Sequence, residues 1–298
     1  MHQRTVPCQG YFAPQKIEEA LEILSGYGKE IKIIAGGTDL LIQYYDRLYE
    51  VGSWLDLKNI LELKEIKIHQ NQMEIGAMVT HAQLEKSEDI KKYFPILSKA
   101  AADIGSPQIR NRGTIGGNIV NASPAGDLLA PLMAYGAQFK LLSIKGEKIV
   151  SAEDFFLGPK KTILEPAQLL TRIILPLPSE RTYGCWIKIG KRKALIIATI
   201  TLALVVEMDE DNKTVKEVRT CLGSVAPTPI EIKEIRKMMV GQNFKQLDFN
   251  QLGQIVEDKI SPIDDIRGTR EYRKDVAKNI VINALEEIDS ARTGRSHK

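Results

Sequence analysis

Two glycine pairs interrupt this chain in the same way, and they limit its possible folds more than any other feature. The segment "IIAGGTDLL" (33–41) passes from an apolar run through a Gly-Gly pair and back to apolar residues. The segment "RGTIGGNIVNASPAGDLLAP" (112–131) repeats this pattern with a second pair. Glycine permits positive φ angles and close approach of another group. Each pair therefore predicts a tight turn between a strand or loop and a following helix.

Such turns can bind an anion, because backbone N–H groups and the helix dipole meet at the start of a helix. Thr38 and Asp39 are candidates to cap the helix after the first pair, and Thr114 and Asn118 can add side-chain hydrogen bonds at the second. The alternative is a pair of tight turns that bind nothing, since one Gly-Gly pair has weak specificity.

The common nucleotide motifs are absent from the sequence. No GxGxxG follows the first expected strand, and no GxxxxGK[ST] occurs anywhere. A diphosphate held by two separate glycine loops remains the physical suggestion, and the spacing of the loops does not identify the nucleotide.

Composition and charge exclude several other classes. The 298 residues carry a net charge of +3, from 41 basic and 38 acidic residues, which gives no electrostatic case for nucleic acid or an anionic membrane. No apolar run approaches the roughly 20 residues of a membrane-spanning helix, and the first residues lack a signal-peptide pattern, so we expect a cytoplasmic protein. The dispersed Cys8, Cys185 and Cys221 are expected to be free thiols, with no disulfide or metal site.

The apolar periodicity predicts an α+β protein with mixed sheets. Strands are expected at 31–35, 53–58, 73–80 and 168–178, a hairpin at 137–150, and a meander over 183–190, 198–208 and 216–225. A helix is expected from Pro14, with Ile17, Ala20, Leu21 and Leu24 on one face. Further helices are expected at 40–45, at 81–106 in two pieces broken before Pro95, at 128–135, at 227–242 and at 268–291, and Ser151 and Asp154 are expected to cap a short turn of helix.

Two prolines, at 176 and 178, mark the expected domain boundary. We expect one domain at 1–178, with subdomains of about 1–58 and 59–178, and a second at 179–291. The polar residues 292–298 are expected to be a frayed tail.

Longer motifs extend beyond the glycine pairs. "KIIAGGTDLLIQ" (32–43) and "GSPQIRNRGTIGGNIVNASPAGDLLAPLMAYGA" (105–137) closely resemble the FAD-binding subunits of the xanthine dehydrogenase family of molybdenum hydroxylases. "WIKIGKRKALIIATITLALVV" (186–206) and "CLGSVAPTPIE" (221–231) follow in that family's order. The resemblance extends from Tyr11 to about Asp289. It implies the fold of vanillyl-alcohol-oxidase-like flavoproteins, followed by a smaller C-terminal α+β domain.

The resemblance also implies a set of site residues. It places a pyrophosphate-binding loop at Lys32, Ile33, Ile34, Ala35, Gly36, Gly37, Thr38 and Asp39, and a second FAD loop at Thr114, Ile115, Gly116, Gly117 and Asn118. It places Asp127 near the adenosine, Lys188 near the isoalloxazine ring, and the apolar Ile104, Leu169 and Leu170 against the cofactor.

The residues themselves leave alternatives open. Ile104, Leu169 and Leu170 could be ordinary core residues, and Asp127 could cap the helix from Leu128. Lys188 stands in a basic cluster with Lys191, Arg192 and Lys193, which is typical of a solvated face or could bind the phosphates of a nicotinamide nucleotide. His81 is expected at the surface.

In function, the resemblance implies an electron-transfer subunit. An iron–sulfur subunit would reduce FAD, reduced FAD would pass a hydride to NAD, and a molybdopterin-binding subunit would oxidise the substrate, in a dimer of heterotrimers. Xanthine is the expected substrate; nicotinate, an aromatic acyl-CoA and carbon monoxide are the family's alternatives. No catalytic residue and no metal ligand are expected on this chain. The rival hypotheses are a stand-alone FAD oxidoreductase and a nucleotide-binding scaffold without redox chemistry.

Overall fold

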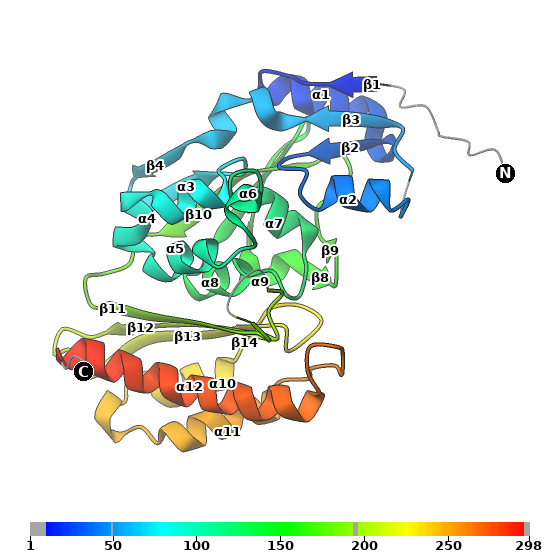
Figure 1. Cartoon of the computed structure of the whole chain (residues 1–298). Coiled ribbons are helices and arrows are strands. Elements are labelled where there is room, and N and C mark those ends of the chain that lie inside the picture. Colours follow the sequence, from blue (N-terminus) through cyan, green and yellow to red (C-terminus); the bar gives the residue numbers. More distant parts are fainter. Residues whose placement is uncertain (1–9, 49, 193–195, 295–298) are drawn as a thin grey trace.

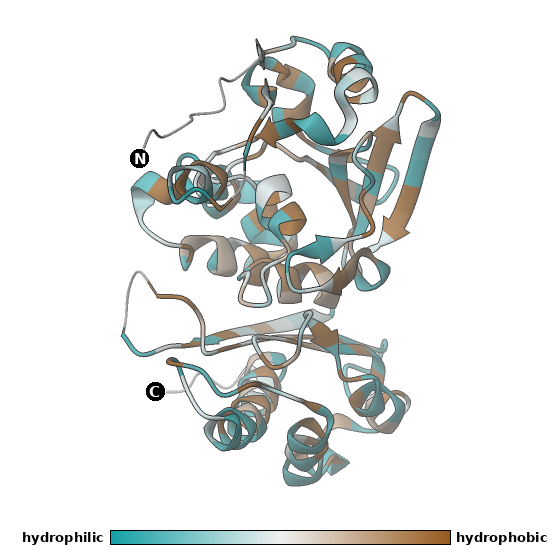
Figure 2. Cartoon of the chain, turned by 90° about the vertical axis from the view of Figure 1, so that its right-hand side faces the viewer, coloured by the Kyte–Doolittle hydropathy of each residue, from teal (hydrophilic) through white to brown (hydrophobic). Residues whose placement is uncertain are grey.

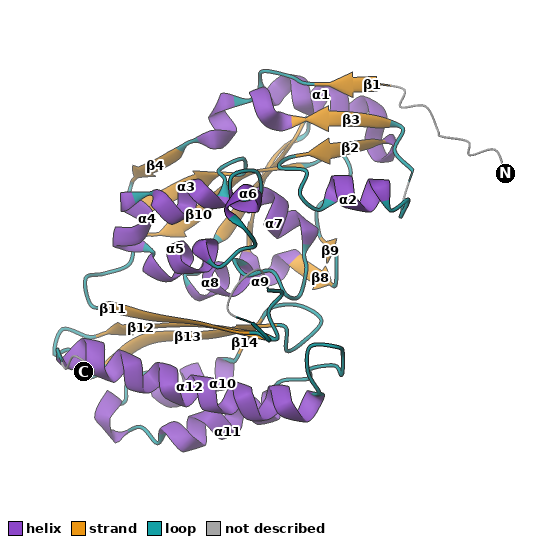
Figure 3. Cartoon of the chain, viewed as in Figure 1, coloured by secondary structure: helices purple, strands orange, loops and turns teal. Residues whose placement is uncertain are grey.

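Three layers are stacked in the computed structural model, which describes residues 10–48, 50–192 and 196–294 (Figure 1). Each layer consists of a sheet with its own helices, as the secondary-structure colouring makes clear (Figure 3). The predicted α+β class is therefore confirmed. No helix among the described residues is both long enough and apolar enough to cross a membrane.

The first layer is a small parallel sheet with β3 in its centre. Its strands are β1 (Gly10–Phe12), β2 (Ile31–Ile34) and β3 (Ser53–Asp56). The helix expected from Pro14 begins at Ile17 instead, as α1 (Ile17–Tyr27), and it buries the four apolar residues of its predicted face. The layer is completed by η1 (Gly28–Glu30), α2 (Leu40–Tyr45), η2 (Leu57–Asn59) and η3 (Leu61–Lys64).

The middle layer is an antiparallel sheet in the order β4-β5-β10-β6-β7. Its central strand corresponds to the strand predicted at 168–178, and the hairpin predicted at 137–150 is present. The edge strand β4 was not expected. The bounds are β4 (Ile66–His69), β5 (Gln72–Gly76), β6 (Gln138–Ser143), β7 (Gly146–Ser151) and β10 (Leu169–Pro176).

Helices cover one face of this sheet (Figure 1). The stretch predicted as two helical pieces forms three, because Ser87 interrupts it and caps the next helix by accepting a hydrogen bond from the Ile90 N–H at 3.3 Å. The elements are α3 (His81–Lys86), α4 (Glu88–Tyr93), α5 (Pro95–Ala102), α6 (Pro107–Arg110), α7 (Ile115–Asn121), α8 (Leu129–Ala134) and α9 (Ala152–Phe155), with the small pair β8 (Phe156–Gly158) and β9 (Lys161–Thr162).

The third layer is the predicted β-meander, covered by helices on its outer face. Its elements are β11 (Thr182–Ile189), β12 (Ile200–Met208), β13 (Val215–Gly223), β14 (Ile230–Glu231), α10 (Lys233–Met239), η4 (Phe244–Gln246), α11 (Phe249–Lys259) and α12 (Arg270–Thr293). Strand β14 and helix α11 were not expected. Helix α12 continues two residues into the expected tail, because the Arg292 side chain is buried and bonds to Asp289.

Both faces of the meander are buried, one against the helices of the middle layer and the other against its own helices. Ala203, Val205 and Cys221 belong to the core that includes α5 and α8, whereas Leu204 and Val206 belong to the core beneath α11 and α12. Successive strand residues point to opposite faces, so one strand serves both cores. The apolar colouring of Figure 2 marks these strands and the adjoining helix faces.

Two of the three cysteines lie in these two cores. Cys185 and Cys221 are buried free thiols, and burial raises the pKa of Cys185 to about 12. Cys8 lies outside the described residues.

Candidate cofactor site

A cavity of about 270 Å³ lies where the first and middle layers meet. The loop after β2 forms one side of it, and α7 with the segment before it forms another. The cavity thus brings together the two glycine motifs, which stand about 80 residues apart in the sequence. Most of the predicted site residues line it: Ile33, Ala35, Gly36, Gly37, Thr38, Asp39, Ile104, Thr114, Gly116, Gly117, Asn118, Leu169 and Leu170.

Close backbone packing explains the glycines of this site. A Cβ on Gly116 would lie 2.6 Å from the carbonyl oxygen of Ala77, so no larger residue fits there. Gly36 packs in the same way against the backbone of Arg112. Gly37 has a φ of +73°, a conformation that favours glycine. Gly117 differs, because a Cβ there would meet side-chain atoms of the cavity lining, Thr114 Oγ1 at 3.0 Å and the Cβ of Ala35 at 3.8 Å, instead of backbone.

The two glycine segments use their N–H groups differently. In the second segment, the N–H groups of Ile115 and Gly116 donate to the carbonyl oxygens of Val79 and Ala77, in the segment after β5, both at 2.9 Å. The Gly117 N–H donates to the side chain of Thr114 at 3.1 Å. These groups are therefore not available to a ligand.

The N–H groups of Gly36, Gly37 and Thr38, by contrast, have no acceptor among the described residues, and these three residues line the cavity. Consecutive N–H groups in a turn form a concavity that favours an anion. The first segment, not the second, thus has the backbone donors that a diphosphate needs.

The polar residues after the two glycine pairs differ in their roles. The side-chain hydrogen bond expected of Thr114 is present, and it caps α7. Helix α2 has no side-chain cap, so the predicted capping by Thr38 or Asp39 is wrong. The Asp39 carboxylate instead accepts a hydrogen bond from the Asn121 amide at 3.4 Å, which joins the two segments across the cavity.

Asn118 carries a polar atom that the fold leaves unsatisfied. Its Oδ1 atom is buried and has no hydrogen-bond partner among the described residues, although the residue lines the cavity. Buried polar atoms are rarely left without a partner. An acceptor here, the free N–H groups opposite and the apolar side chains around them match the mixed chemistry of FAD, so the residues fit this cofactor.

Three predicted residues on or next to the glycine segments lie outside the cavity lining. Lys32 and Ile34 alternate with Ile33 and Ala35, and therefore point to the other face. Ile115 is fully buried in the core of the middle layer.

His81 contradicts the expectation of a surface residue. It is 4% exposed and lines the cavity, and its ring packs against Gly113. Burial lowers the pKa of His81 to about 4, with a smaller contribution from Arg110, so the imidazole is neutral near pH 7. The sequence shows His81 only as the first residue after a strand, which does not reveal that the next segment covers it.

Asp127 and Lys188 form a buried ion pair instead of lining the cofactor cavity. Lys188 Nζ lies 2.7 Å from Asp127 Oδ2, with side chains only 6% and 11% exposed. The solvated reading of Lys188 is therefore wrong. The capping reading of Asp127 is also wrong, because α8 begins at Leu129 without a side-chain cap. Burial raises the pKa of Asp127 to about 6, against the opposing effect of Lys188.

A second cavity, of about 1000 Å³, adjoins this ion pair. It is lined by most of the segment 102–110, by the end of β11 with Lys188, and by the start of the following loop with Lys191 and Arg192. Lys193 lies outside the described residues.

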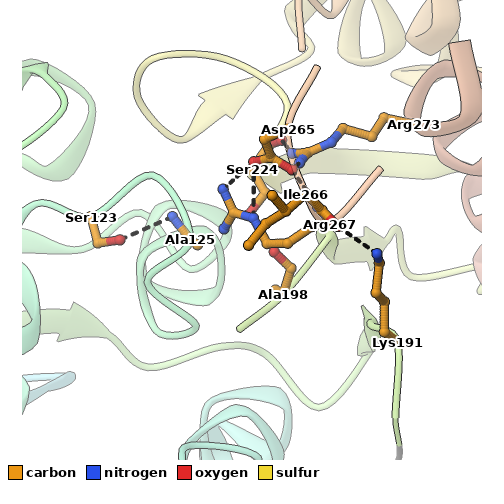
Figure 4. A network of polar contacts seen from close by, with 9 residues as sticks. All are labelled: Ser123, Ala125, Lys191, Ala198, Ser224, Asp265, Ile266, Arg267 and Arg273. Carbon is orange, nitrogen blue, oxygen red and sulfur yellow. Dashed lines mark hydrogen bonds and ion pairs between the residues drawn. The ribbon is translucent and has the colours of Figure 1, made fainter. Parts of the chain in front are cut away.

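A network of polar contacts anchors this loop (Figure 4). Lys191 Nζ bonds to the carbonyl oxygen of Ile266. The neighbouring Asp265 accepts hydrogen bonds from Arg267 and from the fully buried Arg273, and these guanidinium groups hold the pKa of Asp265 well below its usual value. Arg273 also donates to the Ser224 carbonyl at 2.7 Å. The edge of the second cavity is thus tied to α12.

No cluster of three or more His, Cys, Asp or Glu residues that could hold a metal ion occurs in the part of the chain that the structure describes.

Comparisons with known proteins agree with this geometry. Residues 6–178 match the family described as FAD binding domain in molybdopterin dehydrogenase, and residues 186–288 match the CO dehydrogenase flavoprotein C-terminal domain. The nicotinate dehydrogenase FAD-subunit of Eubacterium barkeri is 32% identical, over 94% of this chain and 97% of that protein. The xanthine dehydrogenase FAD-binding subunit of Escherichia coli is 28% identical, over 96% and 97%.

A solved structure is similar over the same length. A chain of the carbon monoxide dehydrogenase from Hydrogenophaga pseudoflava, in a form that lacks the Mo-pyranopterin moiety, superposes with a TM-score of 0.90 at 32% identity, covering 96% of this chain and 98% of that chain. The fold and the site define a flavoprotein with a separate C-terminal flavoprotein domain. The chain belongs to the family of FAD-binding domains in molybdopterin dehydrogenases, as an FAD-binding subunit of the molybdenum hydroxylases.

Proposed function

We propose that FAD binds across the two glycine segments, with its diphosphate on the N–H groups of Gly36, Gly37 and Thr38. The observation that carries this proposal is that these three donors have no acceptor in the part of the chain that the structure describes, and that their residues line a cavity whose other side is the second glycine segment. Asn118 is the candidate for a polar group of the adenosine half. Ile104, Leu169 and Leu170 provide apolar surface for a flat ring.

When bound, FAD supplies the redox chemistry, and the protein supplies binding, orientation and electrostatics. The neutral His81 adds no positive charge to the cavity near pH 7. Thr114 holds the turn of the second segment in place through Gly117.

We further propose NAD as the electron acceptor, with the second cavity as its binding site. The segment 102–110 separates the two cavities: Ile104 and Ile109 face the first, and Asp103 and Arg110 face the second. A hydride acceptor must reach the flavin from a neighbouring space, and Lys191 and Arg192 offer positive charge for phosphate groups.

The partners follow from the same assignment. We propose that an iron–sulfur subunit reduces the FAD and that a molybdopterin-binding subunit oxidises the substrate, in a cytoplasmic dimer of heterotrimers. Xanthine stays a candidate substrate. Nicotinate should be tested beside it, because the relative named for nicotinate is more similar than the one named for xanthine. We also propose the domain division 1–178 and 179–291.

The lone chain tests this division of labour. We expect the purified chain to bind FAD, to contain neither iron nor molybdenum, and to transfer electrons from NADH to a dye without oxidising xanthine or nicotinate. Metal analysis and both assays, repeated after addition of the partner chains, check this. Stoichiometric iron in the lone chain, or hydroxylation without partners, would contradict the proposal.

A further inference from the structure

The segment 102–110 is a thin wall shared by the two cavities. Ile104 faces the cofactor cavity, while its neighbours Asp103 and Gly105 face the second cavity. Gly105 has a φ of +46°, so the wall turns sharply there. Arg110 Nη1 bonds to the Ile104 carbonyl at 3.2 Å, which holds one end of the turn.

Strand β11 holds the other end of the wall through two side chains. Lys188 Nζ donates to the carbonyl oxygen of Asp103 at 2.9 Å, and the Trp186 indole donates to the Asp103 carboxylate at 2.8 Å. Trp186 and Lys188 are two residues apart on one strand, so they share a face. Strand β11 of the third layer thus holds Asp103, the residue directly before Ile104, by its carbonyl oxygen and by its carboxylate.

A buried ammonium group needs a counter-charge, and Asp127 provides it. Lys188 Nζ reaches Asp127 Oδ2 at 2.7 Å, while Asp127 Oδ1 is buried and has no hydrogen-bond partner among residues 10–48, 50–192 and 196–294. Breaking a buried pair by removing one partner is strongly destabilising, because the remaining charge is uncompensated. Asp127 therefore holds the Lys188 side chain in place beside the wall.

We propose that Lys188 is a positioning residue that braces the wall between the cofactor cavity and the second cavity. The brace acts through Asp103, whose carbonyl oxygen lies 2.9 Å from Lys188 Nζ and which directly precedes Ile104. It fixes Ile104 and the mouth of the second cavity relative to each other. An effect of Lys188 on how the electron acceptor reaches the flavin rests on the proposed function, whereas the bracing of segment 102–110 does not depend on it.

The test compares three variants of the FAD-loaded chain. Lys188→Met removes the brace, and Lys188→Met with Asp127→Asn removes both charges without restoring the bond to Asp103. Lys216→Met is the matched control, since it breaks an exposed lysine–glutamate pair on the same sheet, with 2.9 Å between Lys216 Nζ and Glu207 Oε1.

Hydrogen–deuterium exchange of peptides covering 102–110 reports on the brace without any acceptor. We expect faster exchange there in both Lys188 variants and none of this change in the control. Steady-state NADH-to-dye kinetics report on acceptor approach. We expect the Lys188 variants to lose about tenfold or more in kcat/KM for NADH while they retain FAD.

The double variant tests whether the Lys188 variant is impaired because the bond to Asp103 is lost or only because Asp127 is left without its counter-charge. We expect it to recover stability relative to Lys188→Met but not the wild-type exchange or kinetics. Recovery of wild-type stability, exchange and kinetics in the double variant would overturn the proposal. Weaker FAD binding with unchanged exchange in 102–110 would also overturn it, because that result would assign Lys188 to the cofactor. Altered exchange in a protein whose wild type does not use NADH would support the brace and reject NAD as acceptor.

Discussion

A Cβ on Gly36 would lie 2.1 Å from the carbonyl oxygen of Arg112, which shows that the two glycine segments meet backbone to backbone. No side chain can occupy that space unless the segments move apart. Gly36 therefore does more than form a turn: its close packing keeps the two segments at the spacing that the cavity between them requires.

Gly36→Ala should therefore separate the two segments. We expect a loss of about 1–3 kcal/mol in the free energy of unfolding, since the new methyl group collides with backbone and not with a flexible side chain. FAD affinity should fall with it. Urea unfolding and FAD titration measure the two effects, and a variant with wild-type stability and affinity would show that the segments are not in contact.

Asn118→Leu should affect FAD binding and stability in opposite directions. The substitution removes a buried acceptor that has no partner in the described chain, so the chain without FAD should lose no stability and could gain about 1 kcal/mol. FAD affinity should fall, because FAD bound as proposed would lose this acceptor in the lining of the cavity. A stability loss without any change in FAD affinity would assign Asn118 to the fold alone.

Asp127→Ala should be more damaging than the loss of a helix cap. A cap contributes roughly 1 kcal/mol, whereas an uncompensated ammonium at Lys188 should cost about 3–5 kcal/mol. Adding Lys188→Met to this variant should recover part of the loss. Chemical unfolding of both variants checks this, and a loss near 1 kcal/mol with no recovery would restore the capping interpretation.

His81 should make the protein sensitive to acid. Its pKa of about 4 in the folded chain lies below the ordinary value of 6.5, so the unfolded chain binds more protons between these values. Stability from this group is present above about pH 6.5 and is lost as the pH falls toward 4. His81→Gln should remove about 2 kcal/mol of the decrease between about pH 7 and pH 4.5. Equal decreases in both proteins would contradict a buried neutral imidazole.

Local patterns in the sequence predicted much of the fold. The face of α1, the meander and the hairpin of the middle layer follow from apolar periodicity and turn residues. Helix α11 was missed although Asp248 caps it and Leu252 and Val256 share its buried face, because its sequence is largely polar. These errors concern short or polar elements whose stability comes from tertiary packing.

The site was harder to predict, because its contacts are not local. The glycine motifs indicated a shared site, but they did not show which segment has free N–H groups; that depends on Val79 and Ala77, which accept bonds from the second segment. The pairing of Asp127 with Lys188 spans 61 residues and joins two layers, which no local pattern reveals.

The most direct test of a single site formed by both segments is FAD titration of Gly117→Val beside Gly26→Val. Both glycines lie in helices, but a Cβ at Gly117 would lie 3.0 Å from Thr114 Oγ1 and 3.8 Å from the Cβ of Ala35, two residues of the cavity lining, whereas one at Gly26 meets no atom within 4 Å. With folding checked by circular dichroism, we predict one equivalent of FAD bound by the wild type and by Gly26→Val, and no measurable binding by Gly117→Val. A folded Gly117→Val protein that binds FAD as tightly as the wild type would contradict the two-segment site.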